Sequence, residues 1–294
     1  VFFFFFQDAD IFFTKACQEI GIFPPEAIAK PLKHLRTAFD GITDYKTRAQ
    51  DSSWDVLAAT KEQLDKMIRE DEEKSLSKLL TQQLLSGELE KAQQTIEAIE
   101  GDLPESLVET SSWVYIAQGN ILGDQAEQKQ GNEADALFKQ AAEKYQQALM
   151  IKPDSNEALY NWGNTLLGQA RQKQGDEADA LFKQAAEKYQ QALATRLDSN
   201  EALDDWGGTL LDQAKQKQGE EKVKILATAK EKLLQAEQLM RGAGAYNLAC
   251  LFALQDQENE CQQWLNTAWQ TNKLPDCIHL GQDSDLDSVR NQLW

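Results

Sequence analysis

Three cysteines and a histidine near the C-terminus are the residues whose types could bind a metal. Cys250, Cys261, Cys277 and His279 carry the thiolate and imidazole groups that zinc prefers. Cys250 and Cys261, however, are 11 residues apart on two different expected helices, and Cys261 falls at a small-residue packing position. A buried cysteine without a metal packs like a small apolar side chain. The spacing therefore favours core packing, and we expect no metal site.

Three acidic residues close to the C-terminus are spaced like the first ligands of a calcium loop. Asp283, Asp285 and Asp287 alternate as such ligands do. The sixth position, which needs glycine, is Ser288, and the twelfth is Trp294 instead of glutamate. Acidic residues also stabilise the first turn of a helix. We therefore expect these aspartates to cap a final helix.

Residue types for catalysis are scarce in this chain. The two histidines, His34 and His279, leave little for acid–base or triad chemistry. The sequence contains no phosphate-binding loop, dinucleotide fingerprint, H-E-x-x-H helix or G-x-S-x-G elbow. We therefore expect no enzyme activity and no cofactor, and an enzyme in its own right is the least favoured class.

The net charge and the number of cysteines limit which partners and which cellular compartment we expect. The 294 residues carry a formal net charge of −18, which repels phosphate backbones and anionic lipid. We expect no nucleic acid and no membrane as partner; basic partners are favoured, although acidic surfaces more often serve solubility. Four cysteines are too sparse for a disulfide framework, which indicates a reducing compartment, and we expect a cytoplasmic protein.

The first residues form a phenylalanine-rich run, Val1 to Phe6. The run is too short for a signal peptide, and nothing in the chain approaches the about 20 apolar residues of a membrane span. Because exposed phenylalanines aggregate, we expect this run to be packed against other residues. The chain does not begin with methionine, and it is compatible with a fragment of a longer protein.

An internal repeat of 44 residues dominates the middle of the chain. Residues 131–149 and 175–193 are 19-residue stretches that differ at a single position, Asn132 against Asp176. The same offset links three glycines, Gly119, Gly163 and Gly207. Three copies at one spacing indicate a stack of similar units.

Each copy divides into two helices. Ser155 or Asn156 can cap a first helix that carries Leu159, Trp162, Leu166 and Ala170 at helical spacing. Gly175 ends that helix, and Asp176 caps a second helix. The second helix carries its apolar residues along one side: Leu181, Phe182, Ala185, Tyr189 and Ala192. Aromatic residues that recur in this way favour core packing over a ligand cage.

These residues resemble the tetratricopeptide repeat (TPR) family, whose first helix carries an aromatic or leucine and a glycine, and whose second carries small residues and an aromatic. Gly163 and Ala185 are small where paired helices approach, and Tyr189 fills the gap toward the next hairpin. The family repeat is about 34 residues long. The surplus lies between Gly163 and Ala185, so both helices are expected to be longer by roughly five residues.

The resemblance predicts an all-α fold, an α-α superhelix or TPR-like solenoid of about five helical hairpins. The expected hairpins span residues 75–100, 111–152, 155–196, 199–240 and 244–270, with a capping helix over 283–294. Residues 1–74 form an N-terminal helical region or cap, with one helix around Leu32 to Tyr45 and another beginning at Trp54, capped by Ser52 or Ser53. The repeat domain spans 75–294.

Stacked helix pairs make a concave face lined by the first helix of each pair. In this family that face usually binds peptides, which implies a protein-binding scaffold. Asparagine can hold a peptide backbone, although hydrogen bonds between neighbouring hairpins would use the same groups. The residues expected to point into this face are Asn120, Tyr160, Asn161, Asn164, Asp204, Asp205, Tyr246 and Asn247.

The same positions bear on the kind of partner. Family members that bind chaperone tails use lysine and arginine there, and this chain lacks that basic half, so we expect no chaperone-tail binding. Asp204 and Asp205, with Glu201 and Asp212, suit a basic or amphipathic segment. The elongated repeat also resembles plant-type mitochondrial import receptors, which read basic amphipathic presequences. The alternative is a regulatory or oligomerisation array of a larger multidomain protein; the oligomeric state is not predicted.

Overall fold

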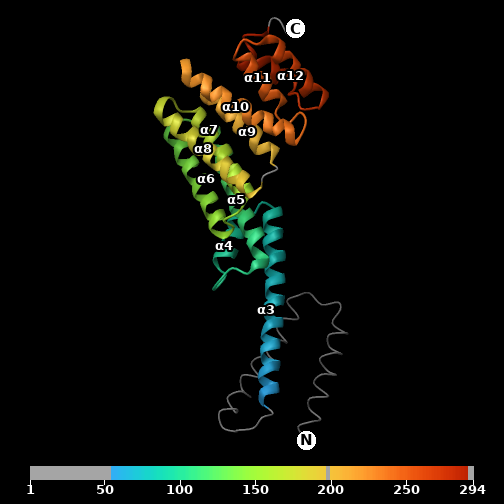
Figure 1. Ribbon diagram of the computed structural model, residues 1–294. Coiled ribbons are helices and arrows are strands. Elements are labelled where there is room, and N and C mark those ends of the chain that lie inside the picture. Colours follow the sequence, from blue (N-terminus) through green and yellow to red (C-terminus); the bar gives the residue numbers. More distant parts are fainter. Residues whose placement is uncertain (1–53, 197–198, 291–294) are drawn as a thin grey trace. The chain divides into compact units, whose positions relative to one another are not determined.

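The computed structural model of the chain describes residues 54–196 and 199–290 (Figure 1). Over these residues the structure contains α-helices and one short 3-10 helix and no strand, which confirms the all-α prediction. The expected helix around Leu32 to Tyr45, the caps Ser52 and Ser53, and the phenylalanine-rich run lie outside the described residues.

The chain divides into two units, which are described separately. Unit 1 contains residues 1–88 and 99–107, and unit 2 contains residues 89–98 and 108–294. In unit 1, α3 (Trp54–Leu85) runs for 32 residues because no glycine or proline interrupts it. It ends before Gly87, whose φ of 75° allows the left-handed turn that closes many helices. Residues 74 and 75, the expected boundary between domains, thus lie inside α3.

The first expected hairpin, over residues 75–100, differs from this expectation. Its first part belongs to α3 in unit 1, whereas α4 (Leu89–Glu97) belongs to unit 2. The two helices are therefore not a single hairpin within one unit.

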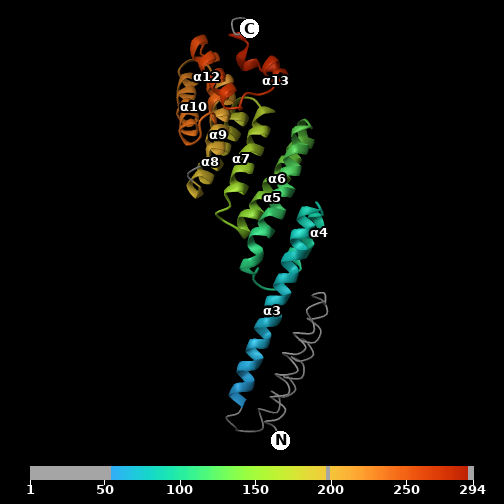
Figure 2. The ribbon, with the colours of Figure 1, turned by 90° about the vertical axis from the view of Figure 1, so that its right-hand side faces the viewer.

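Unit 2 is built from four hairpins that follow one another in sequence. They pair α5 (Glu105–Glu127) with α6 (Gly131–Ile151), α7 (Asn156–Arg171) with α8 (Gly175–Thr195), α9 (Asn200–Lys215) with α10 (Gly219–Leu239), and α11 (Ala245–Ala253) with α12 (Glu258–Gln270). The second helix of each hairpin packs against the first helix of the next, so that the hairpins stack in order (Figures 1 and 2). This arrangement is the TPR-like solenoid that the repeat predicts.

The elongation of the repeat is shared by both helices, as expected. Helices α7 and α8 have 16 and 21 residues, and α9 and α10 have the same lengths. The ordinary-length hairpin at the end has 9 residues in α11 and 13 in α12. The long repeats thus present longer first helices along the same side of unit 2.

The first and second helices of the long hairpins begin in different ways. Ser155 caps α7 by accepting a hydrogen bond from the backbone of Ala158 at 3.2 Å, and Ser199 caps α9 in the same way. The expected cap at Asp176 is wrong: α8 begins at Gly175, and Asp176 lies in its first turn. Gly175 has a φ of 62°, which suits glycine in the turn that leads into α8, and the residue at the N-cap position, Gln174, makes no side-chain cap.

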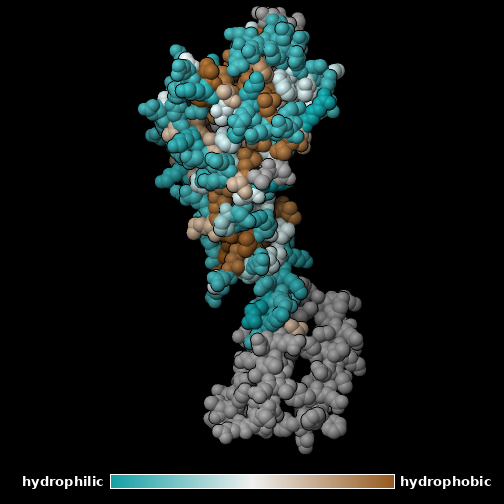
Figure 3. All heavy atoms as spheres, viewed as in Figure 1, coloured by the Kyte–Doolittle hydropathy of each residue, from teal (hydrophilic) through white to brown (hydrophobic). Residues whose placement is uncertain are grey.

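The core of each of the three long hairpins depends on a glycine in the first helix. A Cβ atom built on Gly163 would lie 2.7 Å from the ring of Tyr189, which is fully buried. Gly119 and Tyr145 make the same pair in the preceding hairpin. Hydrophilic side chains cover much of the visible surface of these hairpins (Figure 3). The close approach of the helices explains why the repeat retains small residues at these positions.

The C-terminal segment, defined here as residues 277–290, differs from the expected capping helix. It contains α13 (Cys277–Gln282) and a 3-10 helix, η1 (Ser284–Leu286), instead of one helix from residue 283. Asp283 caps η1 by accepting from the backbone of Asp285 at 2.9 Å, and residues 291–294 lie outside the described part. The segment crosses α9 and α11, with Leu286 and Val289 in their hydrophobic cluster.

Candidate functional site: the first-helix face

The side of unit 2 formed by α5, α7, α9 and α11 is called the first-helix face. All eight residues that the sequence assigns to partner binding lie on these four helices, and each is partly exposed. Their side chains differ in how far they are engaged by other residues of the chain. Two bond to tyrosines of their own hairpins, and one of these two, Asn164, also bonds to Asp205 of the next hairpin. Four others link successive hairpins, one contacts the C-terminal segment, and Asn161 makes no side-chain hydrogen bond within the described residues.

Asn120 and Asn164 hold buried tyrosines of their own hairpins. The Tyr189 hydroxyl donates to Asn164 Oδ1 at 2.6 Å, and the Tyr145 hydroxyl donates to Asn120 Oδ1 at 2.8 Å. Burial raises the pKa of Tyr145 to about 12, so its hydroxyl is neutral at physiological pH. The two asparagines therefore serve the core in addition to any external contact.

Two hydrogen bonds cross from one hairpin to the next. Tyr160 of α7 donates to Asp205 Oδ2 of α9 at 2.5 Å. Asn247 of α11 donates to Asp204 Oδ1 at 2.8 Å. Helices α7, α9 and α11 each carry two adjacent face residues. The first residue of the two on one helix bonds to the second residue of the two on the next helix. Asn164 of α7 also bonds to Asp205, so hydrogen bonding between hairpins, the alternative role considered for these residues, is present at five of the eight positions.

Asp204 and Asp205 form an acidic pair that only neutral donors contact. Burial raises the pKa of Asp204 to about 7, with the nearby charge of Asp205 acting in the same direction. Burial also raises the pKa of Asp205, although the hydrogen bond from Tyr160 opposes this. Both carboxyl groups would gain from a cationic group placed beside them, because it would compensate the desolvation.

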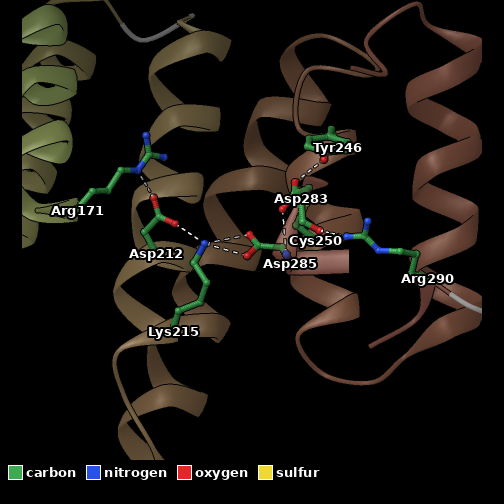
Figure 4. Close-up of polar contacts among 8 residues, drawn as sticks. All are labelled: Arg171, Asp212, Lys215, Tyr246, Cys250, Asp283, Asp285 and Arg290. Carbon is green, nitrogen blue, oxygen red and sulfur yellow. Dashed lines mark hydrogen bonds and ion pairs between the residues drawn. The ribbon is translucent and has the colours of Figure 1, made fainter. Parts of the chain in front are cut away.

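A polar cavity of about 360 Å³ lies at the other end of the face. It is bordered by α9, α11 and the C-terminal segment, and Tyr246 and Asn247 are among its lining residues. Figure 4 shows the ionic network along it: the Arg171 Nε donates to Asp212 at 2.7 Å, and Lys215 bridges Asp212 and Asp285. Arg171 and Lys215 occupy the same repeat position, 44 residues apart, but nothing in the repeat pattern marks this position as part of a site.

The cysteines of unit 2 differ in their burial. Cys250 and Cys261 are buried in the hydrophobic cluster, and burial raises the pKa of both thiols, that of Cys261 to about 11. Cys277 is exposed. No group of three potential metal ligands occurs in the described part of the chain. Among the same residues, no helix has the length and apolar character needed to cross a membrane.

Comparison with known proteins gives two likenesses. Residues 117–201 match the family model described as plant specific mitochondrial import receptor subunit TOM20. Among solved structures, a thermophilic TPR protein of Thermus thermophilus is similar, with 15% identity and a TM-score of 0.44; the match covers 76% of this chain and 100% of that one. No curated protein matches the chain. The family model names one of the two families that the sequence resembles.

Proposed function

We propose that the chain is a non-catalytic scaffold that binds a segment of a partner protein on the first-helix face. The observation that carries this proposal is the row of partly exposed polar side chains on consecutive first helices. Hydrogen bonds between hairpins hold Tyr160, Asp205, Asp204 and Asn247 in place, so the row is preorganised. Preorganised groups lower the entropic cost of binding an extended or helical segment.

The partner segment is basic or amphipathic in this proposal. Asp204 and Asp205 have neutral hydrogen-bond donors and raised pKa values, so a lysine or arginine of the partner would stabilise their charged forms. Asn161 supplies a donor and an acceptor next to Tyr160 that no described residue uses. An affinity of micromolar order, about −8 kcal/mol, is typical of such a modest surface.

Recognition of imported mitochondrial proteins is the specific function to test first. The matching family model covers residues 117–201, which contain four of the eight proposed contact residues: Asn120, Tyr160, Asn161 and Asn164. The resemblance implies that a basic amphipathic presequence is the natural ligand of such a face. A role at the mitochondrial surface, instead of the cytoplasmic one expected from composition, would follow from that ligand.

Calorimetry with three peptides of equal length tests the proposal. A basic amphipathic helix is expected to bind the wild-type chain with micromolar Kd, more weakly at high salt, while a neutral and an acidic helix bind at least about tenfold less tightly. Replacing both Asp204 and Asp205 by asparagine should remove the preference for the basic peptide. A wild-type preference for the acidic peptide would contradict the proposal.

A further inference from the structure

The C-terminal segment lies where a partner would lie. It is joined to α12 by residues 271–276, which form no helix, and it then crosses α9 and α11 on the first-helix face. Tyr246 and Asn247, two of the residues assigned to partner binding, line the cavity beside it together with Asp283. The chain thus occupies part of its own candidate binding surface.

Two aspartates of the segment make polar contacts with side chains of that face. The Lys215 Nζ donates to both carboxylate oxygens of Asp285, at 2.9 and 3.2 Å. The carboxylate of Asp283 accepts from the Tyr246 hydroxyl, and Cys250 Sγ lies 3.8 Å from it (Figure 4). The carboxyl side chain of Asp285 is only 12% exposed. This end of the face therefore binds carboxylates, in contrast to the acidic pair Asp204 and Asp205.

Aliphatic side chains complete the contact. Leu286 and Val289 are each 2% exposed and pack in the cluster that contains Leu210 and Leu211 of α9. Ser288 donates to the backbone oxygen of Ala253 at the end of α11, at 2.8 Å. The bound pattern is therefore two carboxylates two residues apart, followed by aliphatic residues one and four positions after the second.

On its polar side the segment borders an open cavity, whereas the two helices of a hairpin meet in close contact. Within a hairpin, ring atoms approach so closely that Gly163 could not carry a Cβ atom. Beside the C-terminal segment a cavity of about 360 Å³ remains, enough for on the order of ten water molecules. A contact surface that is polar and incompletely packed costs less to open than a close-packed core.

We propose that the C-terminal segment is a tethered ligand of the first-helix face, and that this subsite takes an acidic–aliphatic segment of another protein when the tail is released. Lys215 and Tyr246 bind the two carboxylates, and the cluster around Leu210 and Leu211 receives the aliphatic residues. A tethered competitor acts at an effective concentration of millimolar order, so the tail sets a threshold that an external segment must exceed. The subsite and its ligand differ from those of the basic partner.

A fluorescent peptide of residues 277–290, with Cys277→Ser, tests this in the full chain. The Asp285→Lys variant loses the pair with Lys215, so its own tail competes less, and the peptide should bind it at least about tenfold more tightly than the wild type. The control is Glu260→Lys, an equal change of charge at an exposed side chain of α12 outside the segment, which should bind like the wild type. A peptide carrying Asp285→Lys should bind none of the chains.

Equal affinity of the peptide for all three chains, or equal binding of the charge-reversed peptide, would overturn the proposal. If Asp285→Lys does not fold, a protease site introduced within residues 271–276 of the otherwise wild-type chain replaces it. After cleavage, the labelled peptide should exchange with the cleaved segment; a segment that stays bound without exchange would be part of the core and not a ligand. Because neither experiment uses a basic peptide, its failure leaves the proposed function untouched.

Discussion

Tyr189 and Gly163 are matched in shape: the tyrosine ring fills the space that any side chain at residue 163 would need, at 2.7 Å from an ideal Cβ atom. The third long hairpin has the same relationship with different residues. There Leu233 lies against Gly207, and Gly208 takes the place of Asn164, so the hydroxyl and its acceptor are lost together. From one repeat to the next, the tyrosine ring, its hydroxyl and the asparagine that accepts from it are thus present together or absent together.

The Gly163→Ala substitution should destabilise the chain by about 1–3 kcal/mol, because the tyrosine ring is rigid, fully buried and has no room to move. The matched control is Gly208→Ala, where the nearest atom to the new Cβ is 3.4 Å away. That substitution should be neutral or stabilising by up to about 1 kcal/mol, since alanine favours the helix interior. Urea unfolding of both variants provides the comparison; a loss of equal size at both sites would refute this explanation.

Replacing two asparagines of α7 should have different effects: one replacement should weaken partner binding, and the other should lower stability. Asn161→Ala should weaken binding of the basic peptide by several-fold. It should change the unfolding free energy by no more than about 0.5 kcal/mol, because the Asn161 side chain makes no hydrogen bond to another described residue. Asn164→Ala should cost about 1 kcal/mol of stability, since the Tyr189 hydroxyl loses its acceptor. Calorimetry and chemical unfolding on the same samples measure both. If Asn161→Ala leaves peptide binding unchanged, α7 does not contact the partner at this position.

The raised pKa of Asp204 makes stability depend on pH. Its folded-state pKa of about 7 lies above the value of about 3.9 in an unfolded chain, so the folded chain binds more protons between these values. Stability contributed by this group is therefore present at about pH 4 and lost as the pH rises to about 7. One pKa unit corresponds to about 1.4 kcal/mol, so the effect is measurable.

The Asp204→Asn variant should accordingly be more stable than the wild type at about pH 7 to 8, with a difference that shrinks toward about pH 4. Asparagine keeps an acceptor for Asn247, and the other charged groups around the site, Asp205, Glu237 and Lys273, are unchanged. Thermal unfolding as a function of pH measures the difference. Parallel curves for the two proteins would show that Asp204 does not titrate in this range.

The two helix starts of a long hairpin should respond differently to alanine. Ser155→Ala should cost about 1 kcal/mol, because the first turn of α7 loses its side-chain acceptor. Asp176→Ala should cost less than half of that, since Asp176 lies in the first turn of α8 and only complements the helix dipole. Denaturant unfolding of both variants decides the matter, and a larger loss at Asp176 would mean that it caps the helix after all.

Much of the fold follows from the periodic pattern of the sequence. The paired helices, their added length and the serine cap at residue 155 depend on local chemistry that a single repeat displays. The cap at Asp176 was predicted wrongly because a glycine with positive φ could serve equally well as the end of one helix or the start of the next. The sequence pattern does not distinguish these two uses.

Only part of the candidate site could be predicted from the sequence. Its helices and partly exposed positions could be predicted, because residues beside the packing stripe of each first helix must lie near the surface. The pairs Tyr160–Asp205 and Asp204–Asn247 could not, since they depend on how far one hairpin is displaced against the next. The C-terminal segment was predicted as a regular helix, because its return across α9 and α11 depends on contacts with distant residues such as Lys215.

The near-identity of α6 and α8 has a consequence for how the coding sequence can change. A recombination event that removes residues 136–179 would join Asp135 directly to Ala180, in a helix whose sequence is the same across the junction. Asp135 would then occupy the place of Asp179, which pairs with Lys217, just as Asp135 now pairs with Lys173. The protein could therefore lose or gain one 44-residue hairpin without a frameshift. After a loss, Ile116 and Glu127 would stand where Tyr160 and Arg171 now contact Asp205 and Asp212, so part of the first-helix face would change.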